Sequence, residues 1–136
     1  TVYVPAGIAF HVATALKVSD RVRTLSQAVA KDVCLVARGI DAEAGRASLS
    51  RAIGEVDAGL AALRDGAADL GLRPPRGADL TAELDAVLAE WATLRPVYLA
   101  AAEGGAPAIA ELVSVSRHNN RLLAALDRAV FLYEAE

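Results

Sequence analysis

A short polar stripe interrupts an otherwise aliphatic segment near the start of the chain. Ser19, Arg23 and Ser26 stand at i, i+4 and i+7, so on a helix they share one face, with Gln27 beside them. An arginine between two hydroxyls can bind a small anion, because the guanidinium offers a planar fork of donors and the hydroxyls add more. The pattern indicates a candidate ligand-binding set of Ser19, Arg23, Ser26 and Gln27. An arginine whose stem covers the edge of the fold while its head reaches water gives the same pattern.

The rest of the sequence offers no set of residues for catalysis, and we expect no enzyme. Neither His11 nor His118 has a carboxylate three residues before it, so the paired Glu-x-x-His elements of a di-iron bundle are missing. The acidic residues fall off the apolar seams, where carboxylates are usually solvated. The one cysteine, Cys34, provides no metal set and sits on an apolar helix, so we interpret it as core filler. We expect no metal and no cofactor.

Four segments carry the spacing of apolar residues that helices use to pack against one another. The predicted seam positions are Val18, Val22, Leu25, Val29, Val33 and Val36; Leu49, Ile53, Val56, Leu60, Leu63, Ala67 and Leu70; Leu80, Leu84, Val87, Trp91, Leu94 and Tyr98; and Leu112, Ser116, Asn119, Leu123, Leu126, Val130 and Tyr133. The polar members of the last seam, Ser116 and Asn119, either reach solvent at its rim or specify register or a partner.

Residues that end and begin helices separate these segments. Gly39 can close the first helix in a left-handed conformation, and Asp41 can start the second. The segment 71–77 contains two prolines and breaks the chain, after which Asp79 can cap the third helix. Pro107 follows Gly104-Gly105 and suits the first turn of the fourth helix. Pro96 should kink the third helix near Ala92.

The predicted fold class is all-α: an antiparallel, up-down-up-down four-helix bundle, since short connections make consecutive helices antiparallel neighbours. We expect one domain over residues 1–136, with 1–7 extended or disordered. The composition is 54% hydrophobic but only 4% aromatic, and the net charge is −3. This charge and the lack of a basic run argue against nucleic acid as a partner. No stretch of eighteen apolar residues is available to span a membrane, which leaves any membrane anchor to other parts of a parent protein.

The segment from Arg21 to Lys31, RVRTLSQAVAK, resembles the RQRMLSQRMAK element that opens the PilJ-like N-terminal domain of type IV pili methyl-accepting chemotaxis transducers. Trp91 and the ending from Asn120 to Tyr133 add to the likeness, which covers roughly residues 15–135. That family is related to periplasmic nitrate and nitrite sensors. The resemblance implies a periplasmic, extracytoplasmic sensor domain that takes part in chemotaxis signal transduction and forms a dimer.

The resemblance also implies a role for the polar stripe. Arg23 falls where the nitrate sensors place an arginine that binds the anion at a dimer axis, and Ser26 and Gln27 match the next positions of the motif. The implied partners are a small anion and a second copy of the chain, packed helix 1 against helix 1. Three departures stand out: Ala28 for arginine, Thr24 for methionine, and Ser19-Asp20 for Ala-Gly, with Asp20 free to pair with Arg23 or Arg21. The alternative is a structural or protein-interaction bundle with no small ligand.

Overall fold

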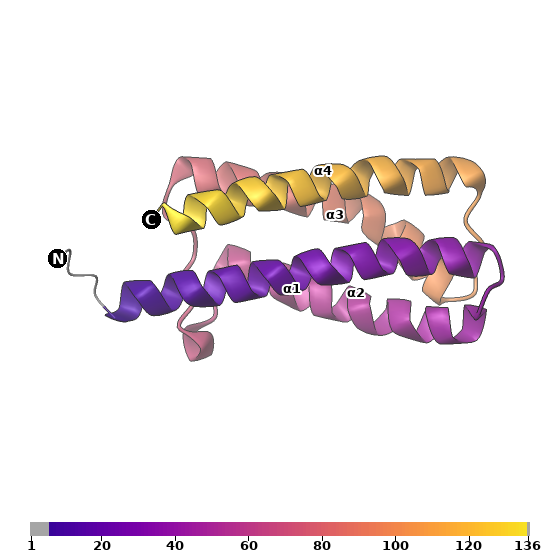
Figure 1. Ribbon diagram of the computed structural model, residues 1–136, viewed down its shortest axis with the longest axis horizontal. Coiled ribbons are helices and arrows are strands. Elements are labelled where there is room, and N and C mark those ends of the chain that lie inside the picture. The colour runs from indigo at the N-terminus through magenta and orange to yellow at the C-terminus, as the bar shows by residue number, and fades with distance from the viewer. Residues whose placement is uncertain (1–5, 136) are drawn as a thin grey trace.

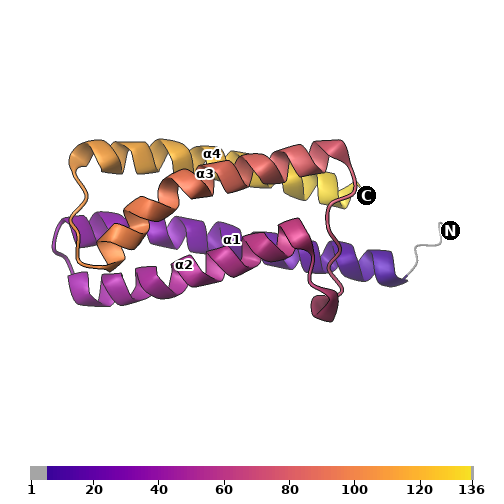
Figure 2. The ribbon, with the colours of Figure 1, turned by 180° about the vertical axis from the view of Figure 1, so that it is seen from behind.

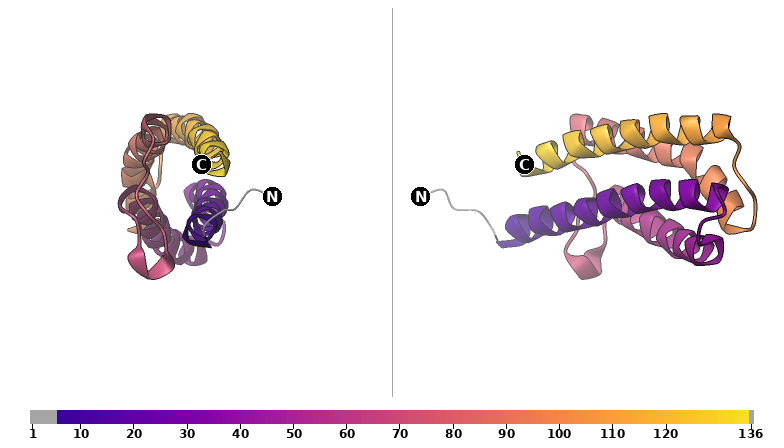
Figure 3. Two further views of the ribbon diagram at one scale, coloured as in Figure 1. Left: turned by 90° about the vertical axis from the view of Figure 1, so that its left-hand side faces the viewer. Right: turned by 45° about the vertical axis from the view of Figure 1, so that its right-hand side comes forward.

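Four long helices dominate the computed structural model, which describes residues 6–135. The elements are α1 (Ala6–Ala37), α2 (Ala42–Asp65), the 3-10 turn η1 (Ala68–Leu70), α3 (Ala78–Ala102) and α4 (Ile109–Glu134). Consecutive helices run in opposite directions, so α1 begins and α4 ends at the same end of the bundle (Figure 1). Seen along the bundle, α1 lies beside α2 and α4, with α3 diagonally opposite (Figure 3). The predicted all-α, antiparallel four-helix bundle is confirmed.

The start of α1 differs from the prediction. Residues 1–7 were expected to be extended or disordered, but Ala6 and Gly7 belong to α1, whereas residues 1–5 lie outside the described residues. A glycine weakens a helix by only about 1 kcal/mol. The following turns bury His11 and Ala15, at 2% and 0% exposure. His11 is held in place, since the Arg73 amide donates to its Nδ1 at 3.0 Å.

The turn between α1 and α2 forms as expected, without the predicted side-chain cap. Gly39 has a φ of 70°, and the Ile40 amide donates to the Leu35 carbonyl across it at 3.0 Å. This bond satisfies a carbonyl that the helix end leaves open. Asp41 stands just before α2, but it has a φ of 47° and its side chain makes no capping hydrogen bond.

Helix α2 ends earlier than its apolar repeat suggested. Gly66, with a φ of 81°, turns the chain away, so Ala67 and Leu70 do not continue the α2 seam as predicted. Ala67 pairs with Leu72 in an isolated antiparallel bridge around η1. Leu72 is buried at 3% exposure and closes this end of the core, while Leu70 is exposed.

The starts of α3 and α4 are each displaced by about two residues from the predicted ones. Gly77 occupies the N-cap position of α3, and Asp79 lies in the first turn. Pro107 precedes α4 instead of standing in its first turn. The Ala108 amide donates to the Glu111 carboxylate at 3.1 Å, which satisfies one of the amides at this helix start.

The core confirms the predicted seams of α2 from Leu49 to Leu63 and of α3 from Leu80 to Tyr98, since every member is buried. In α1 the predicted positions from Val22 to Val36 are also buried, and Val18 packs partly buried against them. Cys34 follows the seam position Val33 and is exposed, so its interpretation as core filler is wrong.

The predicted seam of α4 was misplaced over part of its length. Ser116 is exposed and Leu123 is only half-buried, whereas the neighbouring Val115 and Leu122 are buried. Asn119 is buried at 7% exposure, so it does not reach solvent, and its Oδ1 has no hydrogen-bond partner among the described residues. Leu122 and Leu126 do lie on the seam, but the pattern of larger side chains missed the small buried residues Ala125 and Ala129. The buried α4 residues are Val115, Asn119, Leu122, Ala125, Leu126, Ala129 and Tyr133.

Helices α1 and α2 approach closely because glycines of α2 face valines of α1. A Cβ added at Gly59 would lie 2.7 Å from Val22 Cγ2, and one at Gly45 would lie 2.8 Å from Val36 Cγ2. Real Cβ atoms do not come so close to another carbon, so both positions exclude a side chain in this packing. Gly54, in the same helix, has nothing within 4 Å of such a Cβ.

Pro96 lies inside α3, as predicted. Figure 2 shows α3 beside α4 at its start and turning toward α2 along its second half. A proline removes one backbone hydrogen bond and clashes with the preceding turn, which accounts for the change of direction.

Candidate functional site

A groove between α1 and α4 brings together two of the predicted ligand-binding residues. This α1/α4 groove has a volume of about 260 Å³. Its lining comprises Leu16, Ser19, Asp20 and Arg23 from α1 and Leu126, Asp127, Val130 and Glu134 from α4. Because the two helices are antiparallel, the first half of α1 meets the last turns of α4, and the groove lies toward the end of the bundle where α1 begins (Figure 1).

Arg23 reaches across the α1/α4 groove and forms an ion pair with a carboxylate of its own chain. Its Nη1 donates to Asp127 Oδ1. The Arg23 side chain is 37% exposed and that of Asp127 is 59% exposed. Ion pairs as open to water as this one contribute about 0–1 kcal/mol. Arg23 is therefore partnered in this structure, but weakly and within reach of solvent.

The two predicted serines face the interior of the bundle. Ser19 is 0% exposed and Ser26 is 1% exposed, and neither hydroxyl has a hydrogen-bond partner among the described residues. They occupy inward positions of α1 that alternate with aliphatic residues such as Val22 and Val29. Ser19 contributes to the α1/α4 groove, whereas Ser26 does not line it.

Gln27 is exposed and lies outside the lining of the α1/α4 groove. It stands one turn after Arg23, on the same face of α1. The expected pairing of Asp20 with Arg23 or Arg21 does not occur, because Arg21 donates to Glu55 of α2 at 2.7 Å and Arg23 pairs with Asp127. The ligand-binding roles of Arg23, Ser19, Ser26 and Gln27 all stay predictions.

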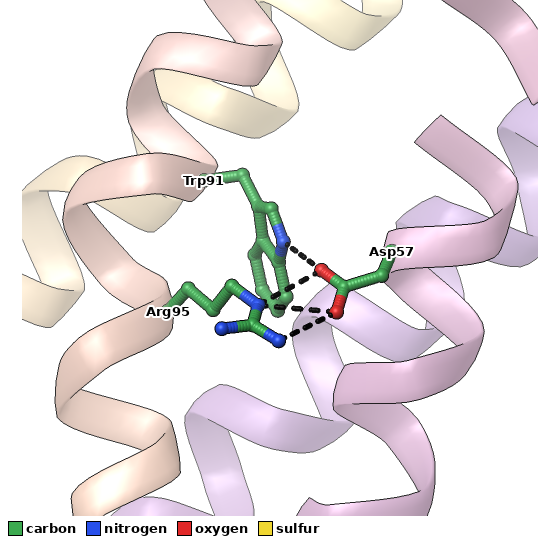
Figure 4. A network of polar contacts seen from close by, with 3 residues as sticks. All are labelled: Asp57, Trp91 and Arg95. Carbon is green, nitrogen blue, oxygen red and sulfur yellow. Dashed lines mark hydrogen bonds and ion pairs between the residues drawn. The ribbon is translucent and has the colours of Figure 1, made fainter. Parts of the chain in front are cut away.

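A second polar cluster ties α2 to α3 on the opposite side of the bundle (Figure 4). Asp57 of α2 accepts a hydrogen bond from Trp91 Nε1 at 2.8 Å. The same carboxylate accepts from Arg95 Nε at 3.1 Å and from Arg95 Nη2 at 2.9 Å. The indole lies in the core with its N–H directed to this carboxylate, so the cluster fixes the register of the two helices.

Two further pairs join α3 to α4. His118 Nδ1 lies 2.5 Å from a Glu90 carboxylate oxygen, and both side chains are mostly buried. Arg128 Nε donates to Glu83 at 2.9 Å. The prediction that the acids lie on solvated faces was wrong for Asp57, Glu83 and Glu90, which are partly buried and pair with residues of another helix. Their positions on one helix gave no sign of these partners.

Tyr98 is a further polar residue of the core, and its ring lies 5.8 Å from that of Trp91. Its hydroxyl has no hydrogen-bond partner among the described residues. Burial raises the pKa of the Tyr98 hydroxyl far above its ordinary value, and the nearby Cys34 raises it further. Across residues 6–135 no group of three His, Cys, Asp or Glu side chains is arranged to hold a metal ion. No described helix is both long and apolar enough to cross a membrane.

Comparison with known families identifies the domain type. The profile of the PilJ family, described as the type IV pili methyl-accepting chemotaxis transducer N-terminus, matches residues 9–116, well over half of the chain. This chain belongs to the PilJ family. The predicted resemblance is confirmed, and the family consists of chemotaxis transducer domains, not enzymes.

The PilJ domain also has a counterpart among solved structures. It is similar to the ligand-binding domain of the P. aeruginosa nitrate receptor McpN, with a TM-score of 0.73 and 22% sequence identity. The match covers 90% of this chain and 94% of the other. At that identity the likeness supports the shared four-helix fold. A search among curated proteins finds no match.

Proposed function

We propose that this PilJ domain is an extracytoplasmic, periplasmic sensor that binds a small anion at Arg23, in a homodimer formed through α1. The observation that carries the proposal is the placement of Arg23 at the α1/α4 groove, in an ion pair exposed enough to exchange its partner. The PilJ family supports a sensory role, and the solved relative is a nitrate receptor domain.

The energetics of Arg23 favour such an exchange. Breaking the exposed pair with Asp127 costs about 0–1 kcal/mol. In a dimer that brings the two copies of Arg23 together, two like charges about 4 Å apart repel by roughly 4 kcal/mol at an effective dielectric near 20. A small anion between them turns that repulsion into attraction. Ligand binding would then favour the close dimer by about 1–3 kcal/mol.

The neighbouring polar residues have different parts in this proposal. Gln27 is exposed one turn beyond Arg23, so its amide is available to an anion held there. Ser19 belongs to the wall of the groove. Ser26 is buried inside the bundle and would need a movement of α1 to reach a ligand.

An anion that takes Arg23 also releases Asp127, and this links binding to a second helix. Arg23 belongs to α1 and Asp127 to α4, and α1 begins where α4 ends (Figure 1). Loss of the pair would loosen α4 from α1 at that end of the bundle. In a parent receptor with membrane helices attached there, this change would be transmitted as a piston or rotation movement.

Calorimetric titration of the domain with nitrate, nitrite, sulfate and chloride tests the proposal. We expect at least one of the small anions to bind, Arg23→Ala to abolish binding, and Asp127→Asn to strengthen it by up to about fivefold, the equivalent of 1 kcal/mol. Arg21→Ala is the matched control, since Arg21 is also an exposed α1 arginine in an ion pair, but with Glu55 on the α2 side. If no anion binds, or if Arg23→Ala and Arg21→Ala behave alike, the anion site is disproved. Light scattering with and without the anion measures the dimer.

A structural or protein-interaction role is the alternative, and one surface favours it. At the other end of the α1/α4 face, Cys34 and Leu35 of α1 and Ile109 and Val113 of α4 line a groove of about 510 Å³. Ile109 is 81% exposed and Val113 is 46% exposed. Exposed apolar residues gathered in one place are a feature of protein contact sites. Two results together would support this role: the domain binds no small ligand, and Ile109→Asn abolishes its association with a partner protein or with a second copy of itself.

A further inference from the structure

We infer that the α1/α4 groove binds a small zwitterion, a ligand that carries an ammonium group close to a carboxylate, as a simple amino acid does. The inference rests on the proposed sensory function, because the carboxylate would take Arg23. It adds a requirement for a positive group in the ligand, which a bare anion such as nitrate does not satisfy.

The charges around the groove carry the argument. Three carboxylates line it, Asp20, Asp127 and Glu134, against one cation, Arg23. Arg23 already pairs with Asp127, while Asp20 and Glu134 make no ion pair within residues 6–135. The groove therefore holds an excess of two negative charges. A bare anion that enters it is attracted by one group and repelled by three, whereas a zwitterion adds no net charge and offers each side its opposite.

Ser19 adds a polar group to the wall of the groove. Its hydroxyl is fully buried, it belongs to the groove lining, and it has no hydrogen-bond partner among the described residues. Buried hydroxyls are nearly always hydrogen-bonded, because an unpaired one is destabilising. A ligand donor or acceptor that enters between α1 and α4 would satisfy it.

The remaining walls set the size of the ligand. Leu16, Leu126 and Val130 provide apolar surface on both helices, and the volume of about 260 Å³ suits a molecule of a few non-hydrogen atoms with a short aliphatic side chain. The carboxylates are not arranged to hold a metal ion. A polyatomic ammonium group, which can reach one or two of them through separate N–H bonds, fits their spread better.

The binding mode exchanges one ion pair for two. The ligand carboxylate accepts from the Arg23 guanidinium in place of Asp127. The freed Asp127, together with Asp20 or Glu134, accepts from the ligand ammonium. All these residues come from one chain, so the expected stoichiometry is one ligand per subunit. An anion shared at the α1 dimer axis binds instead as one per two subunits.

Calorimetry on the intact domain with matched probes tests this inference. L-alanine carries both charges, propionate lacks the ammonium, ethylammonium lacks the carboxylate, and nitrate is the bare anion. We expect L-alanine to bind at one per subunit, with propionate and ethylammonium each at least about tenfold weaker. Asp20→Asn and Glu134→Gln should each weaken L-alanine several-fold and leave nitrate binding equal or stronger. Asp85→Asn, an exposed α3 carboxylate away from the groove, is the control and should change neither.

The outcomes separate this inference from the function on which it rests. Binding of nitrate without L-alanine, or propionate binding as tightly as L-alanine, overturns the zwitterion and leaves the anion sensor standing. Equal loss of L-alanine binding in Asp20→Asn, Glu134→Gln and Asp85→Asn also overturns it, because the groove carboxylates would then have no special role. If neither nitrate nor L-alanine binds, both proposals are wrong. The fluorescence of the single tryptophan, Trp91, verifies the fold of every variant.

Discussion

Replacing Gly59 by alanine tests whether α1 and α2 pack as closely as the structure places them. Alanine is the better helix former, and in an exposed helix position the change from glycine stabilises by about 1 kcal/mol. At Gly59, however, the new Cβ would lie 2.7 Å from Val22 Cγ2 and 3.7 Å from Val18 Cγ1. Val22 is β-branched and buried at 1% exposure, so its methyl group cannot turn aside.

Gly54 supplies the reference for the size of the effect. A Cβ at Gly54 has nothing within 4 Å, so Gly54→Ala should show the helix-propensity gain alone, about 1 kcal/mol. Overpacking a core position typically destabilises by about 1–3 kcal/mol. The net expectation for Gly59→Ala is therefore between no change and a loss of about 2 kcal/mol. For a domain of 136 residues, 1 kcal/mol corresponds to about 3–4 °C in Tm.

Thermal unfolding followed by circular dichroism distinguishes the two variants. We expect Gly54→Ala to raise Tm by about 3 °C and Gly59→Ala to lower it by up to about 7 °C. In the Gly59→Ala background, Val22→Ala should destabilise less than it does in the wild type, because it removes the methyl group that clashes. Equal stabilisation by both glycine substitutions would refute the close approach of α1 and α2.

Further predictions concern polar groups inside the bundle. Asp57→Ala removes the acceptor of the Trp91 indole and of Arg95. We expect the free energy of unfolding, measured in urea, to fall by about 1–3 kcal/mol and the Trp91 fluorescence to shift. Unchanged values would mean that the cluster does not form. Ser26→Ala removes a buried hydroxyl that has no partner in the described part of the chain. It should stabilise the fold by about 1–2 kcal/mol in the same assay and leave ligand binding intact. A loss of binding would instead make Ser26 a ligand residue. Because burial raises the pKa of Tyr98, the unfolded chain releases this proton first, so stability should fall as pH rises above about 10, and more steeply than in Tyr98→Phe.

The sequence predicted the buried positions of a helix most reliably where large side chains alone define the buried face. In α2 and α3 the repeat consists of leucine, valine, isoleucine and aromatic residues, and each predicted position from Leu49 to Leu63 and from Leu80 to Tyr98 is buried. In α4 part of the seam was placed one residue too far along, at Ser116, Leu123 and Val130, and the buried Ala125 and Ala129 were missed. The burial of a small residue depends on what packs against it, which spacing along one helix does not reveal.

The sequence predicted only part of the candidate site. Spacing identified Arg23 and Ser19 on one side of α1, and both line the α1/α4 groove. The partner of Arg23 could not be found, because Asp127 is separated from it by more than a hundred residues and reaches it only through the antiparallel pairing of α1 with α4. Trp91 did carry a usable signal: an indole on a buried seam needs an acceptor, and Asp57 provides it.

The two neighbours of α1 hold it in different ways, and this difference decides how a ligand could act. Against α2, α1 packs extensively and closely, with Gly59 facing Val22; α3 and α4 form the other closely packed pair. Between the two pairs, α1 meets α4 less extensively, across a groove bridged by the exposed Arg23–Asp127 pair. On the opposite side, the Asp57 carboxylate ties α2 to α3 through three hydrogen-bonding groups. The contact of α2 with α3 is about as extensive as that of α1 with α4, so the two sides differ in their polar links and not in the extent of their packing. A ligand that takes Arg23 would release the link between α1 and α4, while the Asp57 cluster would still join α2 to α3.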